Sequence, residues 1–144
     1  MIQHVWSVLC RMASIDVQTN SISMFAAVEG LTAMGEINSN RPAILEAEIV
    51  SLWYRGDDNP VSGRMRTSYT DPNSQEQPLL PLDITLTQGK FHRTRISIGA
   101  LPLFLQGTYH FKVEFQTEGS DIWELAATLP LIIGVELIPH PPHP

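Results

Sequence analysis

Acidic residues in three turn-forming stretches are the side chains of this sequence best suited to hold a ligand. If consecutive strands run antiparallel, alternate loops share one end of the fold, and these carboxylates come together. Oxygen ligands on such loops can bind Ca2+. Asp is also a common turn residue and no DxDxDG spacing occurs, so a purely structural role is the competing interpretation. Asp71 would lie at the opposite end, about 20 Å away by strand rise. The candidate cluster comprises Asp16, Asp57, Asp58, Glu118 and Asp121.

Nucleophilic and metal-binding side chains elsewhere form no catalytic motif. His110 falls on an outward position of an alternating segment, and His140 and His143 stand in a proline-rich tail that could bind a metal only nonspecifically. Cys10 is the only cysteine, so an internal disulfide and a multi-cysteine metal cluster are excluded. It falls on the inward-facing positions of an alternating segment, which predicts a buried, inert thiol. No GxSxG, HExxH or glycine-rich phosphate loop occurs. We therefore predict no enzymatic activity and no cofactor.

Aromatic and arginine side chains each allow two interpretations. Exposed aromatic rings could stack on sugars, but the apolar neighbours of the three tryptophans favour a place in the core. Outward-facing arginines on two strands could form a small basic patch, or simply a solvated face. The aromatic set is Trp6, Trp53, Trp123, Tyr54, Tyr69 and Tyr109, and the arginines are Arg64, Arg66, Arg93 and Arg95.

Composition limits the class of protein and its partners. A chain of 144 residues fits one domain, and 11 Pro and 9 Gly with few helix-forming runs favour an all-β class. A net charge of -6 with 9 basic residues argues against nucleic acid as a partner. No stretch approaches the roughly 20 apolar residues of a membrane span, and the first residues lack a positively charged leader, so we expect no membrane contact. A single cysteine fits a reducing, cytoplasmic environment.

Alternating apolar and polar residues predict about eight short strands. The clearest covers residues 109–117, where Tyr109, Phe111, Val113 and Phe115 alternate with polar residues. Short strands joined by turns, with no helix-length segment, favour a two-sheet antiparallel β-sandwich. Residues 1–134 would form this single domain and residues 135–144 a proline-rich tail. The other expected strands cover residues 4–13, 22–31, 43–54, 64–70, 82–87, 91–98 and 122–133.

Several segments carry more specific expectations. Residues 22–31 are apolar on both faces, which predicts a central strand or one packed against another subunit. Residues 64–70 are expected near a sheet edge, and Pro130 predicts that the last strand is an edge strand or contains a bulge. Residues 71–81 read as a long polar loop, and residues 101–105 as a short helical turn.

The segment Leu105-x-Gly107-x-Tyr109 resembles the turn into a late strand of immunoglobulin-like sandwiches, where a tyrosine hydroxyl bonds back to upstream backbone. Together with SLWYRG from position 51, an Asp71-Pro72 loop and a final apolar strand, it resembles a group of short, uncharacterised bacterial proteins. The resemblance implies an immunoglobulin-like β-sandwich and no catalytic residue.

These observations lead to a non-enzymatic β-sandwich module that binds another protein or a second copy of itself. The apolar character of residues 22–31 and 50–54 exceeds what one sandwich needs to cover its core. The alternative is a calcium- or carbohydrate-binding accessory domain that uses the acidic loops or the aromatic residues.

Overall fold

A computed structural model of the protein describes residues 2–86 and 89–136. Within these residues the chain forms nine strands, numbered in sequence order, and no helix. The strands are β1 (Ile2–Ile15), β2 (Ile22–Ala27), β3 (Gly30–Met34), β4 (Ala43–Arg55), β5 (Val61–Thr70), β6 (Glu76–Leu86), β7 (Phe91–Leu103), β8 (Gly107–Thr117) and β9 (Glu124–Glu136).

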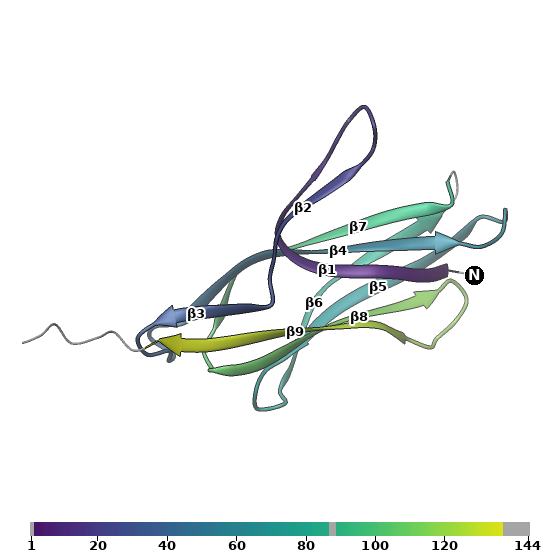
Figure 1. Cartoon of the computed structure of the whole chain (residues 1–144). Helices are drawn as coiled ribbons and strands as arrows, with labels where there is room; N and C mark the ends of the chain where they lie inside the picture. Colours follow the sequence, from purple (N-terminus) through teal and green to yellow (C-terminus); the bar gives the residue numbers. More distant parts are fainter. Residues whose placement is uncertain (1, 87–88, 137–144) are drawn as a thin grey trace, which may run out of the picture.

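Two sheets pack face to face, so the predicted all-β sandwich is confirmed (Figure 1). A four-stranded sheet has the order β2-β1-β4-β7, and a five-stranded sheet has the order β3-β9-β8-β5-β6. Neighbouring strands are antiparallel except β3 and β9, which pair in parallel. The last strand continues to Glu136, two residues beyond the predicted end of the domain, and the remainder of the expected tail lies outside the described residues.

The core lies between the sheets and follows the predicted alternation in β4 and β8. Leu45, Ile49 and Trp53 of β4 are at most 1% exposed, whereas Glu46 lies on the outer face. The indole N–H of Trp53 donates a hydrogen bond of 2.9 Å to the buried hydroxyl of Thr94 on β7. The period of two therefore places one complete face of each strand in the core.

The tyrosine corner is confirmed at the start of β8. The Tyr109 hydroxyl accepts a hydrogen bond of 3.1 Å from the Leu105 N–H and donates one of 3.0 Å to the Leu105 carbonyl. Gly107 has a φ of 134°, and a Cβ there would lie 2.9 Å from the ring of Pro72. Both the backbone angle and the space therefore require glycine at this turn.

The prediction of a central strand at residues 22–31 is wrong. This segment forms two strands at the edges of different sheets, β2 and β3. Between them the Val28 N–H donates to the Leu9 carbonyl, and the Glu29 carbonyl accepts from the Ile132 N–H, so the chain crosses from one sheet to the other. The apolar residues of β2 are largely exposed on a hairpin and are not covered by strands on both sides.

Two further predictions about the five-stranded sheet are only partly right. Residues 64–70 lie in β5, an interior strand between β8 and the edge strand β6, so the segment is near an edge but does not form it. Their arginines point outward and pair with acids on the neighbouring strands, so they did not indicate an edge. Residues 71–81 are not all loop, because β6 begins at Glu76. As β6 is the edge strand, Pro78 and Pro81 are tolerated there.

Of the two alternatives predicted for the last strand, an edge position or a bulge, the edge position is wrong. β9 lies between β3 and β8, yet β3 pairs with it only from Ile132 onward. Pro130 therefore sits where one side of β9 is open. The expected bulge is present beside Leu125, which is consequently exposed and not in the core. The helical turn expected at residues 101–105 is wrong as well, because β7 continues to Leu103.

Candidate functional site

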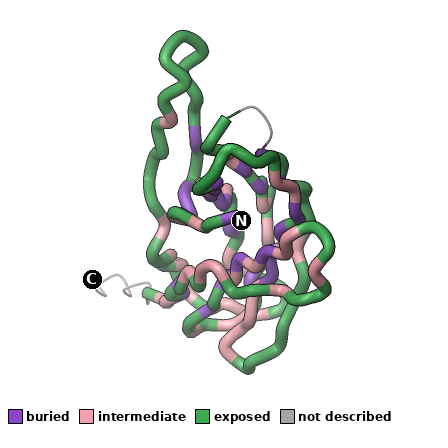
Figure 2. The backbone as a smooth tube through the Cα atoms, turned by 90° about the vertical axis from the view of Figure 1, so that its right-hand side faces the viewer, coloured by how far each residue is buried: buried purple, intermediate pink, exposed green. Residues whose placement is uncertain are grey.

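The most distinctive feature is a hairpin that projects from the sandwich, formed by residues 10–27 and called the arm below (Figure 1). β1 pairs with β4 from Ile2 to Cys10 and then leaves it, and beyond that point it pairs with β2 alone. Figure 2 shows that the arm is exposed along nearly its whole length. The arm exists because β1 continues past its last partner in the sandwich.

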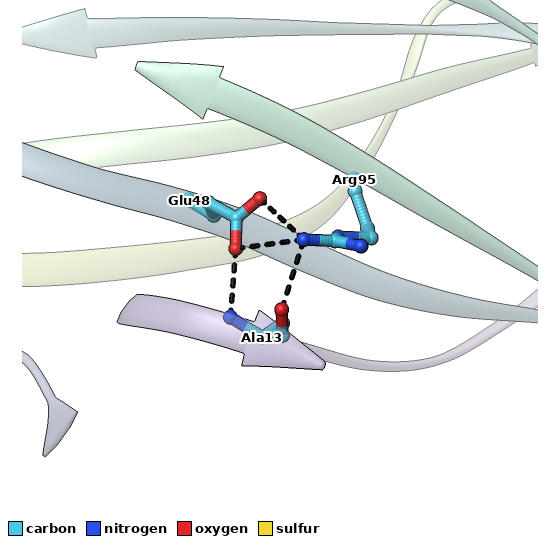
Figure 3. Close-up of polar contacts among 3 residues, drawn as sticks. All are labelled: Ala13, Glu48 and Arg95. Atoms are coloured by element: carbon cyan, nitrogen blue, oxygen red, sulfur yellow. Dashed lines mark hydrogen bonds and ion pairs between the residues drawn. The ribbon is translucent and has the colours of Figure 1, made fainter. Parts of the chain in front are cut away.

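An ion pair on the sandwich holds the arm at Ala13 (Figure 3). The Ala13 N–H donates a hydrogen bond of 2.8 Å to Glu48 of β4, and the Ala13 carbonyl accepts one of 3.0 Å from Arg95 of β7. Glu48 and Arg95 are themselves joined at 2.8 Å. Two side chains thus satisfy the backbone groups that a neighbouring strand would otherwise bind.

A small apolar cluster separates the arm from the outer face of the four-stranded sheet. Cys10, Ala13 and Val50 are buried in it, with Trp6 and Ile22 packed alongside. The predicted burial of the Cys10 thiol is confirmed. Burial, and then the nearby Glu48 carboxylate, raise the pKa of this thiol, so it is a poor nucleophile near neutral pH.

A cleft of about 540 Å³ opens beneath the end of the arm. Apolar side chains of the arm, including Ile15 and Ile22, face Trp6 and Phe91 across it. Arg93 of β7 donates a hydrogen bond to the backbone carbonyl of Asn20, which gives the arm a second contact with the sandwich. The arm is therefore attached at two points.

The opposite surface of the arm exposes apolar side chains. Met12 and Phe25 face each other across the hairpin and are 58% and 52% exposed. Met24 lies on the other face of the arm, with Ala13 and Ile22, and is 37% exposed, and Val17 near the turn is 98% exposed. Ala26, beside a break in the pairing, has a φ of 54°, a conformation that costs a residue other than glycine about 1–2 kcal/mol. This strain marks the bend where the arm joins the sandwich.

The five acidic residues of the predicted calcium site do not form one group. In the described part of the chain, no cluster of three or more His, Cys, Asp or Glu side chains could hold a metal ion. The β4–β5 and β8–β9 loops share one end of the sandwich, as the antiparallel argument predicted, because Gly63 pairs with Thr117. Asp16 lies on the arm instead, since β1 carries it away from that end.

Two of these carboxylates stabilise their own turns. Asp16 accepts hydrogen bonds from the backbone N–H groups of Thr19 and Gln18, at 2.9 and 2.8 Å, which lower the pKa of its carboxyl group. Asp57 accepts one of 3.0 Å from the Asn59 N–H. The structural interpretation of these residues therefore has direct support.

A chain of polar hydrogen bonds links β1 and β4, and sequence reasoning did not find it. His4 Nε2 lies 2.7 Å from the Ser7 hydroxyl, which lies 2.7 Å from the Ser51 hydroxyl. The His4 ring packs edge-on against Trp53, and burial lowers its pKa. Ser51 is fully buried, whereas His4 and Ser7 are partly buried, so this chain of hydrogen bonds satisfies the buried Ser51 hydroxyl.

The aromatic and arginine predictions have mixed outcomes. Trp53 is in the core as predicted, but Trp6 lies under the arm and Trp123 lies outside the core, where the Arg66 guanidinium stacks 4.2 Å from its ring. Arg66 also pairs with Glu114 at 3.2 Å, and Arg95 with Glu48. These arginines therefore contribute to cross-strand pairs and not to a free basic patch.

No family model and no curated protein matches the sequence. Among solved structures, a family 123 glycoside hydrolase from Clostridium perfringens is similar with a TM-score of 0.41 and 13% identity, over 80% of this chain and 24% of that chain. The N-terminal domain of PorA is similar with a TM-score of 0.34 and 11% identity, over 91% of this chain and 98% of that chain. At these TM-scores neither likeness carries an argument about function. In the described residues no helix is long and apolar enough to cross a membrane.

Proposed function

We propose that the protein is a non-enzymatic β-sandwich module that binds another protein through the arm. The observation that carries this proposal is the pairing of Met12 with Phe25 on a projecting hairpin, with both side chains more than half exposed. Exposed apolar side chains gathered on one element are typical of protein interaction sites.

The construction of the arm supports the same conclusion. A two-stranded hairpin is marginally stable by itself. Here Glu48, Arg95 and the buried cluster around Cys10 hold it against the sandwich, while its other surface contributes nothing to the core. A rigidly held apolar surface loses little conformational freedom when a partner covers it.

A photo-cross-linking amino acid at position 25 tests the proposal in a lysate of the organism that encodes the protein. We expect discrete cross-linked products, formed either with a second copy or with a different protein. The matched control places the same group at position 125, because Leu125 is 60% exposed on the other sheet. Equal, diffuse labelling from both positions, with the protein folded, would contradict the proposal.

The alternative of a calcium- or carbohydrate-binding domain has weaker support. Asp16 lies on the arm, apart from the loops that carry Asp57 and Glu118, and Asp16 and Asp57 cap their own turns. A rise in melting temperature in millimolar Ca2+ or with a panel of glycans would favour it, because a ligand that binds the folded state stabilises that state.

A further inference from the structure

We propose that the partner is a second copy of this chain, and that the two arms join edge to edge through β2. This inference rests on the proposed function, since it takes the arm as the contact. Its first support is the direction of the backbone groups of β2. Ala13 directs its N–H and carbonyl away from β2, toward Glu48 and Arg95, and Ala13 lies opposite Met24.

In an antiparallel pair of strands, the backbone N–H and carbonyl groups of two opposite residues either bond to each other or all point away from the pair. Met24 therefore presents its N–H and carbonyl on the outer side of β2, and Ile22, two residues earlier, does the same. The bond between the Asp16 N–H and the Ser21 carbonyl, 2.9 Å long, fits this alternation. Because β2 ends the order of its sheet, that side has no neighbouring strand in the described fold.

The second support is the chemistry of this edge. Edge strands are commonly protected by charged residues, proline or bulges. The sequence ISMFAA of β2 contains neither a charge nor a proline, and no charged residue occurs between Asp16 and Glu29. Two molecules with a net charge of -6 repel each other over most of their surfaces, but this segment adds nothing to that repulsion.

The third support is self-complementarity. A two-fold axis at Met24 lets its N–H and carbonyl bond reciprocally to the same groups of the second copy. The same register places Ser23 opposite the Phe25 of the other copy, so that a small residue meets a large one. The two Phe25 rings then lie diagonally across the junction, where aromatic side chains can touch. The four-stranded sheets of both molecules become one continuous sheet.

Light scattering during size-exclusion chromatography of the full chain tests this arrangement. We expect a concentration-dependent species of twice the 16.1 kDa chain mass. Met24→Pro removes only an outward N–H and adds a ring on the open side, so it should give a monomer with an unchanged melting temperature. Phe25→Lys should do the same through charge repulsion. Leu125→Lys, a change on β9 at a residue that is 60% exposed against 52% for Phe25, should remain dimeric.

The outcomes separate this inference from the proposed function. A dimer that persists in Met24→Pro overturns the edge pairing, even if Phe25→Lys dissociates it. A wild-type monomer whose cross-linker at position 25 captures a different protein overturns the dimer and leaves the proposed function standing. A monomer that forms no discrete product from position 25 overturns both.

Discussion

Replacing Glu48 should release the Ala13 amide without unfolding the sandwich. This amide donates its hydrogen bond of 2.8 Å to the Glu48 carboxylate, a side chain 17% exposed. A hydrogen bond to a charged group contributes about 1.5–3 kcal/mol. Because 1.4 kcal/mol corresponds to a factor of ten, Glu48→Ala should accelerate hydrogen exchange at Ala13 by about 10- to 100-fold. Glu48→Gln keeps an acceptor oxygen and should have a smaller effect.

Two internal comparisons make this measurement decisive. The Val28 amide, bonded to the Leu9 carbonyl at the base of the arm, should exchange as slowly in the variant as in the wild type. Glu46→Ala removes an exposed carboxylate two residues away on the same face of β4 and should leave Ala13 protected. Unchanged exchange at Ala13 in Glu48→Ala, or the same acceleration in Glu46→Ala, would refute the role of the carboxylate.

Three other changes have clear expected outcomes. Tyr109→Phe removes both hydroxyl bonds of the corner and should lower the free energy of unfolding by about 1–2 kcal/mol in urea titrations. Gly107→Ala forces a Cβ to within 2.9 Å of Pro72 at a φ of 134° and should lower the melting temperature, with a cost of about 1–3 kcal/mol. Burial lowers the pKa of His4 and His92 from 6.5, so the unfolded chain binds more protons as the pH falls below that value. The free energy of unfolding should therefore decrease on acidification, and less steeply in His4→Gln; an equal slope in that variant would exclude His4 as a source.

The core could be predicted from the sequence because its pattern is local. The alternation in β4 and β8 assigns one face to the core without any knowledge of the partner strands. The Tyr109 corner was equally predictable, since its hydroxyl reaches backbone only four residues away. A period of two and a short loop are properties of a few consecutive residues.

Strand neighbours could not be predicted in this way. Arginines at positions 64 and 66 indicate edge protection, but they lie on an interior strand and pair with Asp83 and Glu114 on its two neighbours. Pro130 indicated an edge strand or a bulge, and β9 does lack a neighbour on its β3 side before Ile132, in the part that contains Pro130. In each case the residue type does indicate a structural preference. Its interpretation depends on which strand lies alongside, and a short stretch of sequence does not specify that neighbour.

The arm was missed for the same reason. The apolar residues of 22–31 indicated that this segment packs against another strand or another subunit. They did not indicate that β1 leaves β4 after Cys10. That departure is stabilised by Glu48 and Arg95, which are 47 residues apart in the sequence. The departure of β1 carries Asp16 away from the other acidic loops, whereas the calcium hypothesis assumed that Asp16 lies beside them.

The bonds at Ala13 also distinguish the inner edge of the arm from its outer edge. Where β1 leaves β4, its inner backbone groups would be free to bind any extended chain. Glu48 and Arg95 bond to those groups at Ala13, so the inner edge of the arm is closed there by its own molecule. In the described part of the chain, no side chain bonds to the backbone on the outer edge, which belongs to β2. In the proposed dimer a two-fold axis relates the two chains, so each uses the edge of its own β2 in the contact. That edge is then no longer open in either chain, and pairing through it stops at two chains and does not continue into a fibre.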